Sequence, residues 1–136
     1  MTEAFIGAKL AILVGDKIVT ILRDDFPTIP YPDHWDLPGG GREGNETPQE
    51  CVLRETFEEL GLQFAHDDLL WAYNPPESWF FVTEKPNIDL ESIRFGDEGQ
   101  CWRLADISWF LESARTVPNQ PDRLRKYLAV RKRYQR

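Results

Sequence analysis

The sequence predicts one α/β domain that spans residues 1–136. Three observations support this. Short apolar stretches separated by glycine and proline are typical of strands. A segment near the middle carries both a start and a stop signal for a helix, and an amphipathic segment ends the chain. The length is sufficient for one sizeable core.

The first half is predicted to be mainly extended. Residues 5–14 are almost all apolar, which indicates a strand buried on both faces. Gly15 and Asp16 form a turn signal, and residues 17–22 give a second strand, so a hairpin is expected. Residues 26–33 contain three prolines and predict a stiff loop. Residues 35–38 predict a short strand that leads into a glycine loop, which begins with Gly39, Gly40 and Gly41.

The central helix is predicted to begin at Pro48. Thr47 can cap the free amides, Pro48 suits the first helical position, and Glu50 completes a capping box. Gly61 can adopt the left-handed conformation that ends a helix.

The second half alternates strands and helices. Strands are predicted at residues 69–73, 79–83 and 101–104, and helices at 105–113 and 121–133. Strand alternation places Trp79, Phe81 and Thr83 on one face and Phe80 and Val82 on the other.

Three carboxylates follow one another along the central helix. Glu55, Glu58 and Glu59 stand at i, i+3 and i+4, so they share one helix face. Acidic groups at a helix C-terminus oppose the macrodipole and repel each other. A cation reverses both penalties, and hard carboxylate oxygens suit Mg²⁺ or Mn²⁺. The alternative is a solvated acidic face with no ligand.

Residues in and around this helix form one pattern with fixed spacing. They are Gly40, Glu46, Arg54, Glu55, Thr56, Glu58, Glu59, Gly61 and Leu62. The pattern resembles the Nudix box, G-x5-E-x7-R-E-U-x-E-E-x-G-U, except that Thr56 stands at a U position, where a larger aliphatic residue is usual. The resemblance implies an α/β/α sandwich with a mixed sheet, and hydrolysis of a nucleoside diphosphate linked to another group with a divalent metal.

The resemblance also implies roles for individual residues. Either Glu55 or Glu98 is the general base, and Asp97 could replace Glu98. Helical phase puts Arg54 on a different side from the glutamates, where it would orient a carboxylate such as Glu46 or Glu55. The predicted metal ligands are the Gly39 carbonyl, Glu55, Glu58, Glu59 and Glu98.

The small size resembles the Nudix group that cleaves 8-oxo-dGTP to the monophosphate and pyrophosphate. That likeness predicts substrate contacts from Arg23, from Phe80 or Phe81, and from Asn119 in the loop before the last helix. Each has a simpler explanation: a rim salt bridge with Asp24 or Asp25 for Arg23, core packing for the aromatic rings, and a cap or turn for Asn119.

Other substrates and roles remain open. ADP-ribose, a dinucleoside polyphosphate and a nucleotide sugar are alternative substrates within the family. A non-catalytic nucleotide sensor is a third possibility, although a sensor has no need for all the glutamates.

The composition limits the partners. A net charge of −7 argues against a nucleic-acid polymer as the main partner, whereas a small nucleotide carried with its metal fits. The two cysteines form no CxxC pair, which predicts free thiols in the cytoplasm. The apolar stretch 5–14 is short and contains Lys9, so we expect neither a membrane span nor a signal peptide. A monomer and a homodimer both remain possible.

Overall fold

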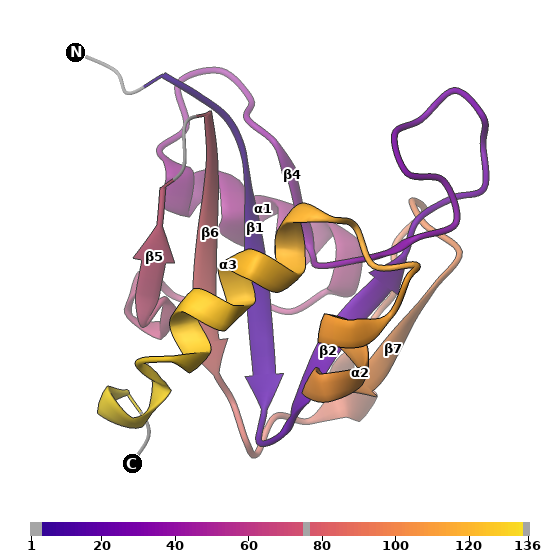
Figure 1. Ribbon diagram of the computed structural model, residues 1–136. Helices are drawn as coiled ribbons and strands as arrows, with labels where there is room; N and C mark the ends of the chain where they lie inside the picture. The colour runs from indigo at the N-terminus through magenta and orange to yellow at the C-terminus, as the bar shows by residue number, and fades with distance from the viewer. Residues whose placement is uncertain (1–3, 75–76, 135–136) are drawn as a thin grey trace.

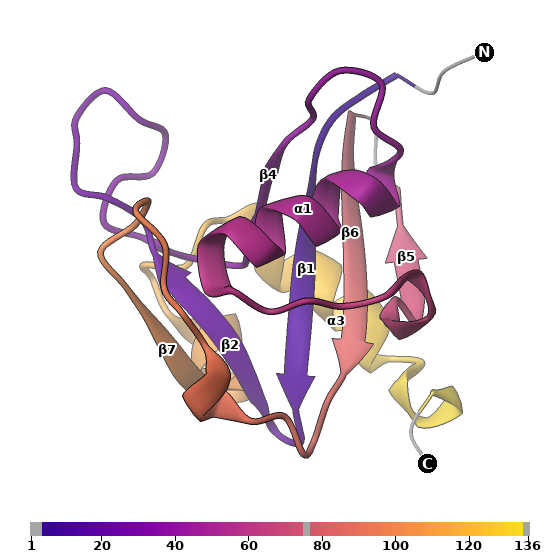
Figure 2. The ribbon, with the colours of Figure 1, turned by 180° about the vertical axis from the view of Figure 1, so that it is seen from behind.

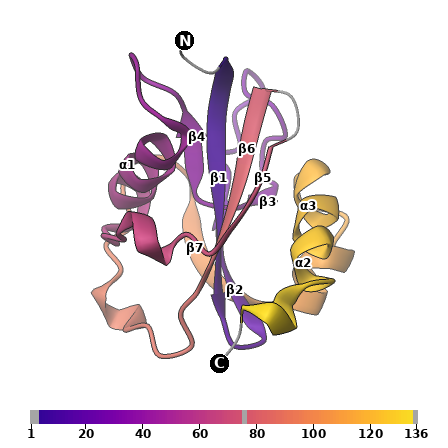
Figure 3. The ribbon, with the colours of Figure 1, turned by 90° about the vertical axis from the view of Figure 1, so that its left-hand side faces the viewer.

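A mixed β-sheet carries helices on both of its faces (Figures 1 and 3). The computed structural model describes residues 4–74 and 77–134, so the proline pair at 75–76 lies outside the described residues. The strands are β1 (Phe5–Val14), β2 (Lys17–Leu22), β3 (Trp35–Asp36), β4 (Gly39–Gly41), β5 (Trp71–Tyr73), β6 (Glu77–Glu84) and β7 (Cys101–Asp106). The helices are α1 (Pro48–Leu60), α2 (Ile107–Glu112) and α3 (Asn119–Leu128), with 3-10 turns at His66–Asp68, Leu90–Ser92 and Arg131–Arg133.

The sheet order is β3-β2-β1-β6-β5, with β4 paired to β1 and β7 paired to β2. β1 and β2 form the predicted antiparallel hairpin, and Gly15 in its turn has φ of 64°. β6 runs parallel to β1, which makes the sheet mixed. α1 covers one face, and α2 and α3 cover the other (Figures 2 and 3). The predicted α/β/α sandwich is therefore confirmed.

Two hydrophobic cores lie on the two faces of the sheet, and strand alternation divides residues between them. The core that includes α1 contains Leu10 and Ile12 of β1 together with Phe81, whereas the α3 core contains Ala11, Leu13, Phe80 and Val82. The predicted alternation along β6 is confirmed.

Helix α1 begins and ends as predicted. The Thr47 hydroxyl accepts a hydrogen bond from the Glu50 amide at 3.1 Å, and the Thr47 amide donates to the Glu50 carboxylate at 2.8 Å. Gly61 has φ of 68° at the C-terminal end. Phe57 lies outside the core, because the residue is 54% exposed. The buried stripe instead runs through Cys51, Val52, Thr56 and Leu60.

The predicted glycine loop is in part a strand. Gly39–Gly41 pairs with β1, and a β-carbon on Gly39 would lie 2.1 Å from the Ala8 carbonyl oxygen. Only glycine allows so close an approach of two backbones. This pairing brings the glycine segment against the centre of the sheet, next to the C-terminal half of α1.

The last helix runs from Asn119 to Leu128 rather than over 121–133. Pro121 lies within its first turn, where the missing N–H leaves no hydrogen bond unmade. Beyond its end, Arg131 pairs with Glu84 at 2.8 Å, at the end of β6. Within residues 4–74 and 77–134, no helix combines the length and the apolar character needed to cross a bilayer.

Candidate functional site

Two hollows meet where α1 approaches β4. The larger, of about 560 Å³, is bounded by β1, β2, β4 and α1, by the loop after β2 and by the loop before β7. The smaller, of about 320 Å³, lies over the exposed side of α1. Glu55, Glu59 and Glu98 line both hollows, so the two form one continuous depression.

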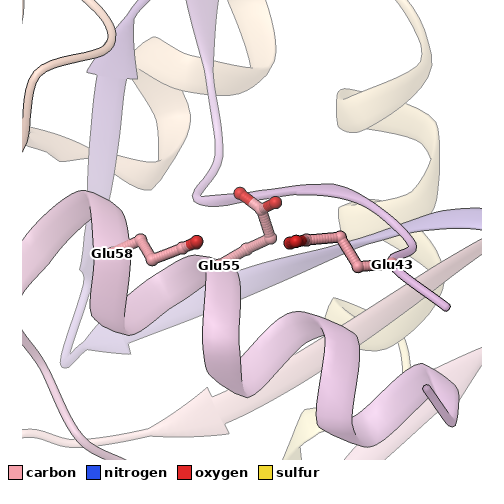
Figure 4. Close-up of side chains that lie close together, drawn as sticks. All are labelled: Glu43, Glu55 and Glu58. Atoms are coloured by element: carbon pink, nitrogen blue, oxygen red, sulfur yellow. The ribbon is translucent and has the colours of Figure 1, made fainter.

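Glu43, Glu55 and Glu58 form an acidic cluster at the smaller hollow. One carboxylate oxygen from each lies within 4.8 Å of the others, and the three side chains converge (Figure 4). Glu55 and Glu58 were predicted to meet in this way. Glu43 was missed, because it stands at an unspecified position of the Nudix box and only the fold of the loop before α1 brings it close.

Glu59 lies apart from this cluster and turns toward β4. Its Oε1 accepts a hydrogen bond from the Gly39 amide at 2.7 Å. Burial raises the pKa of Glu59 to about 7, although the Gly39 amide and the charge of Lys9 act in the opposite direction. The nearby charges of Glu55 and Asp36 raise it further. The three glutamates of α1 that were predicted as ligands are therefore neighbours along one depression and not a single cluster.

The Glu55 carboxylate occupies a place that only glycine leaves open. A β-carbon on Gly40 would lie 2.6 Å from Glu55 Oε2. Partial burial raises the pKa of Glu55, the Arg54 guanidinium lowers it, and the charges of Glu58 and Glu98 raise it. Glu98 is exposed in the loop before β7, and its charge acts on Glu55 across the hollow.

Arg54 contacts the acidic residues on both sides of it. Its Nε and Nη2 donate to Glu46 at 2.6 and 3.1 Å, and Nη1 donates to Glu55 at 3.0 Å. These contacts confirm the predicted partners. The expectation that helical phase keeps Arg54 away from the other glutamates is wrong, because its long side chain also reaches Glu58 at 2.9 Å and Glu43 at 2.8 Å.

Asp36 is the polar centre of the larger hollow, and its side chain is almost fully buried. It accepts hydrogen bonds from Lys9 at 3.0 Å, from Arg23 at 3.3 Å and from Gln120 at 3.1 Å. The ion pair of Arg23 is therefore formed with Asp36, and not with Asp24 or Asp25. Arg23 also donates to the Pro30 carbonyl at 2.9 Å. The available sequence signal was Lys9 itself, a lone charge in an apolar strand.

Phe80 and Phe81 do not line the hollow. Their side chains are 0% and 2% exposed, and they belong to opposite cores. β6 lies between β1 and β5 and is covered on both faces, so neither ring offers a surface to a ligand. The core-packing interpretation of both rings is correct, and their predicted stacking on a base is wrong. Asn119 is exposed at the start of α3 and is not among the described residues that line the two hollows, although the next residue, Gln120, contacts Asp36 in the larger one.

The side chains around the smaller hollow fit a hard divalent cation. All candidate donors are carboxylate oxygens, which are the ligands that Mg²⁺ and Mn²⁺ prefer. The guanidinium of Arg54 already contacts Glu43, Glu55 and Glu58, so a cation bound there shares these carboxylates with Arg54 or displaces it.

Comparisons with known proteins agree with this geometry. The NUDIX domain profile matches residues 7–126. An 8-oxo-dGTP diphosphatase of Proteus vulgaris is 42% identical over 60 residues, which are 39% of this chain and 54% of that protein. A diphosphoinositol polyphosphate phosphohydrolase 3-alpha of Mus musculus is 48% identical over 64% of this chain and 58% of its own length. The chain thus spans just over half the length of these two relatives.

A solved structure shows the same fold over nearly the whole chain. The MutT protein of Methanosarcina mazei Go1 superposes with a TM-score of 0.73 and 17% identity, covering 97% of this chain and 99% of that protein. Since the profile match covers most of the chain and the box residues surround one depression, this protein belongs to the Nudix family.

Proposed function

We propose that this protein is a pyrophosphohydrolase that uses Mg²⁺ or Mn²⁺ to cleave a nucleoside diphosphate linked to another group. A nucleoside triphosphate, such as 8-oxo-dGTP, is the first candidate substrate, and its products are the monophosphate and pyrophosphate. One observation carries this proposal: the acidic cluster at α1 lies beside the larger hollow, called the chamber from here on, and Arg23 lines that chamber. The names of two relatives, an 8-oxo-dGTP diphosphatase and a phosphohydrolase, support it.

The carboxylates of Glu43, Glu55 and Glu58 would hold the cation, and Glu59, Glu98 and the Gly39 carbonyl border the same space. A bound divalent cation supplies charge neutralisation on the diphosphate and lowers the pKa of a water molecule. Glu55 or Glu98 accepts the proton of the attacking water. Arg54 would act as a positioning residue: it borders the smaller hollow, and its guanidinium donates to the carboxylates of Glu46, Glu55 and Glu58.

Arg23 is placed to bind the part of the substrate that lies beyond the phosphates. Pro30 and Asp36 hold two of its nitrogens, so the guanidinium is oriented before a ligand arrives. A planar donor fork of this kind suits a carbonyl oxygen or ring nitrogen of a base. Cys51 and Cys101 are not joined in a disulfide, which fits the proposed cytoplasmic location.

A second candidate substrate is a diphosphoinositol polyphosphate, which the 48% identity to the mouse phosphohydrolase favours. ADP-ribose, dinucleoside polyphosphates and nucleotide sugars are the other candidate substrates, and together these compounds form the panel to be tested. A nucleotide sensor without activity is disfavoured, because the glutamates of the box are all present.

The test is hydrolysis of this panel with Mg²⁺, with products identified by chromatography. A triphosphate yields monophosphate plus pyrophosphate, whereas ADP-ribose yields AMP plus ribose phosphate. The absence of turnover on every compound, with tight nucleotide binding retained, would favour the sensor.

The variant Glu58→Gln tests the metal assignment. It keeps the shape of the side chain and removes one charge of the cluster, so we expect at least a ~100-fold loss of Mg²⁺-dependent turnover with the fold intact. Mn²⁺ affinity, measured by electron paramagnetic resonance, should fall in parallel. Glu112→Gln is the control, since that glutamate is 79% exposed at the end of α2. Full activity of Glu58→Gln would refute the assignment.

A further inference from the structure

We infer that Phe26 forms the wall on which the base of the substrate stacks, and that the chamber thereby selects a nucleotide over an inositol polyphosphate. This inference rests on the proposed function, since it names the group bound at the far end of the same site. Phe26 replaces Phe80 and Phe81 in this role, because both of those rings are buried in the cores.

The chamber has two chemically different ends. At one end Gly39, Glu55 and Glu59 border the acidic cluster, where phosphates and their cation belong. At the other end, the loop between β2 and β3 contributes Phe26 and Ile29, next to Arg23. A ligand that fills the chamber therefore meets carboxylates at one end and, at the other, apolar side chains together with the Arg23 guanidinium, which suits the phosphates with their cation and the base of a nucleotide.

Phe26 lines the chamber and keeps much of its surface open to solvent, since the residue is 56% exposed. Single exposed apolar residues are common on protein surfaces, so what distinguishes Phe26 is its place in the lining of the chamber. Beside it, the Arg23 guanidinium is held by Pro30 and Asp36. An exposed ring next to an oriented hydrogen-bond donor suits a flat heteroaromatic group, which can stack and accept a hydrogen bond together.

The loop that carries Phe26 is anchored to the rest of the fold. It stands beside the start of β7 (Figure 2). The Gly99 amide donates to Asp24 Oδ2 at 3.1 Å, and Gln100 Nε2 donates to Asp33 Oδ1 at 2.8 Å. Arg115 pairs with Asp33 at 2.8 Å. These contacts, with three prolines, restrain the loop before a ligand arrives, which lowers the entropic cost of binding.

The charges of the chamber disfavour an inositol polyphosphate. Such a ligand needs an excess of cations around it. Lys9 and Arg23 are the basic residues among the described residues of the lining, and both already pair with the buried Asp36. Five carboxylates line the same chamber: Asp24, Asp36, Glu55, Glu59 and Glu98.

The test compares Phe26→Ala with Tyr31→Ala. Tyr31 is an exposed aromatic residue of the same loop that packs against His34 and does not line the chamber. For a nucleoside triphosphate, Phe26→Ala should raise KM about tenfold with kcat retained, the effect of losing one stacked base. Phe26→Trp should keep the KM of the wild type. Inhibition by inorganic tripolyphosphate, which has no base, should be unchanged in all variants.

An equal effect of Phe26→Ala and Tyr31→Ala, or an equal loss of tripolyphosphate inhibition, would overturn the role of Phe26. Preferred hydrolysis of a diphosphoinositol polyphosphate would overturn the substrate choice and leave the pyrophosphohydrolase intact. Calorimetric binding of a nucleoside monophosphate does not depend on turnover. Phe26→Ala should weaken that binding about tenfold even if the wild type hydrolyses nothing, which separates this inference from the proposed function. Failure of the wild type to bind any mononucleotide would overturn both.

Discussion

The Glu59 carboxylate accepts a hydrogen bond from the Gly39 amide, with 2.7 Å between Oε1 and N. The contact joins the last turn of α1 to the glycine strand β4. On the other side of the same residue, the Gly39 carbonyl accepts from Lys9 at 3.3 Å. Gly39 is thus held from both sides, and the carboxylate that holds it is largely buried.

Glu59→Gln should remove a pH dependence of stability. Because burial raises the pKa of Glu59 to about 7, the folded protein keeps a proton that the unfolded chain releases near pH 4.5. This carboxyl therefore destabilises the fold as pH rises from 4.5 to 7, by at most ~3 kcal/mol above pH 7. The glutamine retains the acceptor for Gly39 and avoids the charge. Urea denaturation in EDTA should show the variant more stable at pH 8 and equal to the wild type at pH 4.5.

The same substitution should weaken metal binding, although it stabilises the fold, because it removes the negative charge of a candidate metal ligand. Glu59→Gln should bind Mn²⁺ more weakly while being more stable without metal. A stability difference that stays constant between pH 4.5 and 8 would contradict the assignment of the raised pKa to Glu59.

Gly40→Ala should displace the Glu55 carboxylate without removing any charge. The added β-carbon would lie 2.6 Å from Glu55 Oε2, and the side chain must rotate away. We expect a loss of about tenfold in Mn²⁺ affinity, similar to the loss of a group that orients a ligand. The stability cost should be small, since the end of a flexible side chain moves. Calorimetric titration with Mn²⁺ and thermal unfolding give the two quantities.

Gly41→Ala is the matched control, because the nearest atom to its β-carbon is the Ile6 carbonyl oxygen at 3.9 Å. That variant should bind Mn²⁺ like the wild type. Equal affinities in the two variants would show that Gly40 does not set the position of Glu55.

Local sequence signals predicted the parts of the fold that depend on neighbours in the chain. The caps of α1, the β1–β2 hairpin and the alternation along β6 follow from spacing and residue type alone. The strand character of Gly39–Gly41 could not be predicted in this way. Glycine has a low strand propensity, and the pairing depends on β1, about thirty positions earlier in the chain.

The residues of the site also fall into those that local spacing predicts and those that only the tertiary structure brings in. The box identified Glu55 and Glu58, whose proximity is a property of one helix. Glu43 and Asp36 join the site through tertiary structure, and no spacing rule places them. The stacking expectation for Phe80 and Phe81 was wrong because a pattern of exposed and buried faces cannot show that a strand is covered on both sides.

Arg54→Met should destabilise the metal-free protein and increase the stabilisation by Mg²⁺. The guanidinium contacts Glu43, Glu46, Glu55 and Glu58, so its removal leaves mutually repelling carboxylates. Hydrogen bonds to charged groups contribute about 1.5–3 kcal/mol, and partial exposure of this site reduces the expected loss to ~1–2 kcal/mol. Thermal unfolding in EDTA and in 10 mM Mg²⁺ measures both effects.

The size of the loss in unfolding free energy distinguishes a positioning role of Arg54 from that of an ordinary surface ion pair. Arg125 is a suitable control, since it is half exposed and pairs with Glu112 and Asp122 at 3.6 and 3.7 Å, so Arg125→Met should cost less than ~0.5 kcal/mol. Arg54→Lys keeps the charge but cannot reproduce the two-pronged contact with Glu46, and it should fall between the wild type and Arg54→Met. If Mg²⁺ raises Tm equally in the wild type and in Arg54→Met, the cation and Arg54 do not share the carboxylates of the acidic cluster.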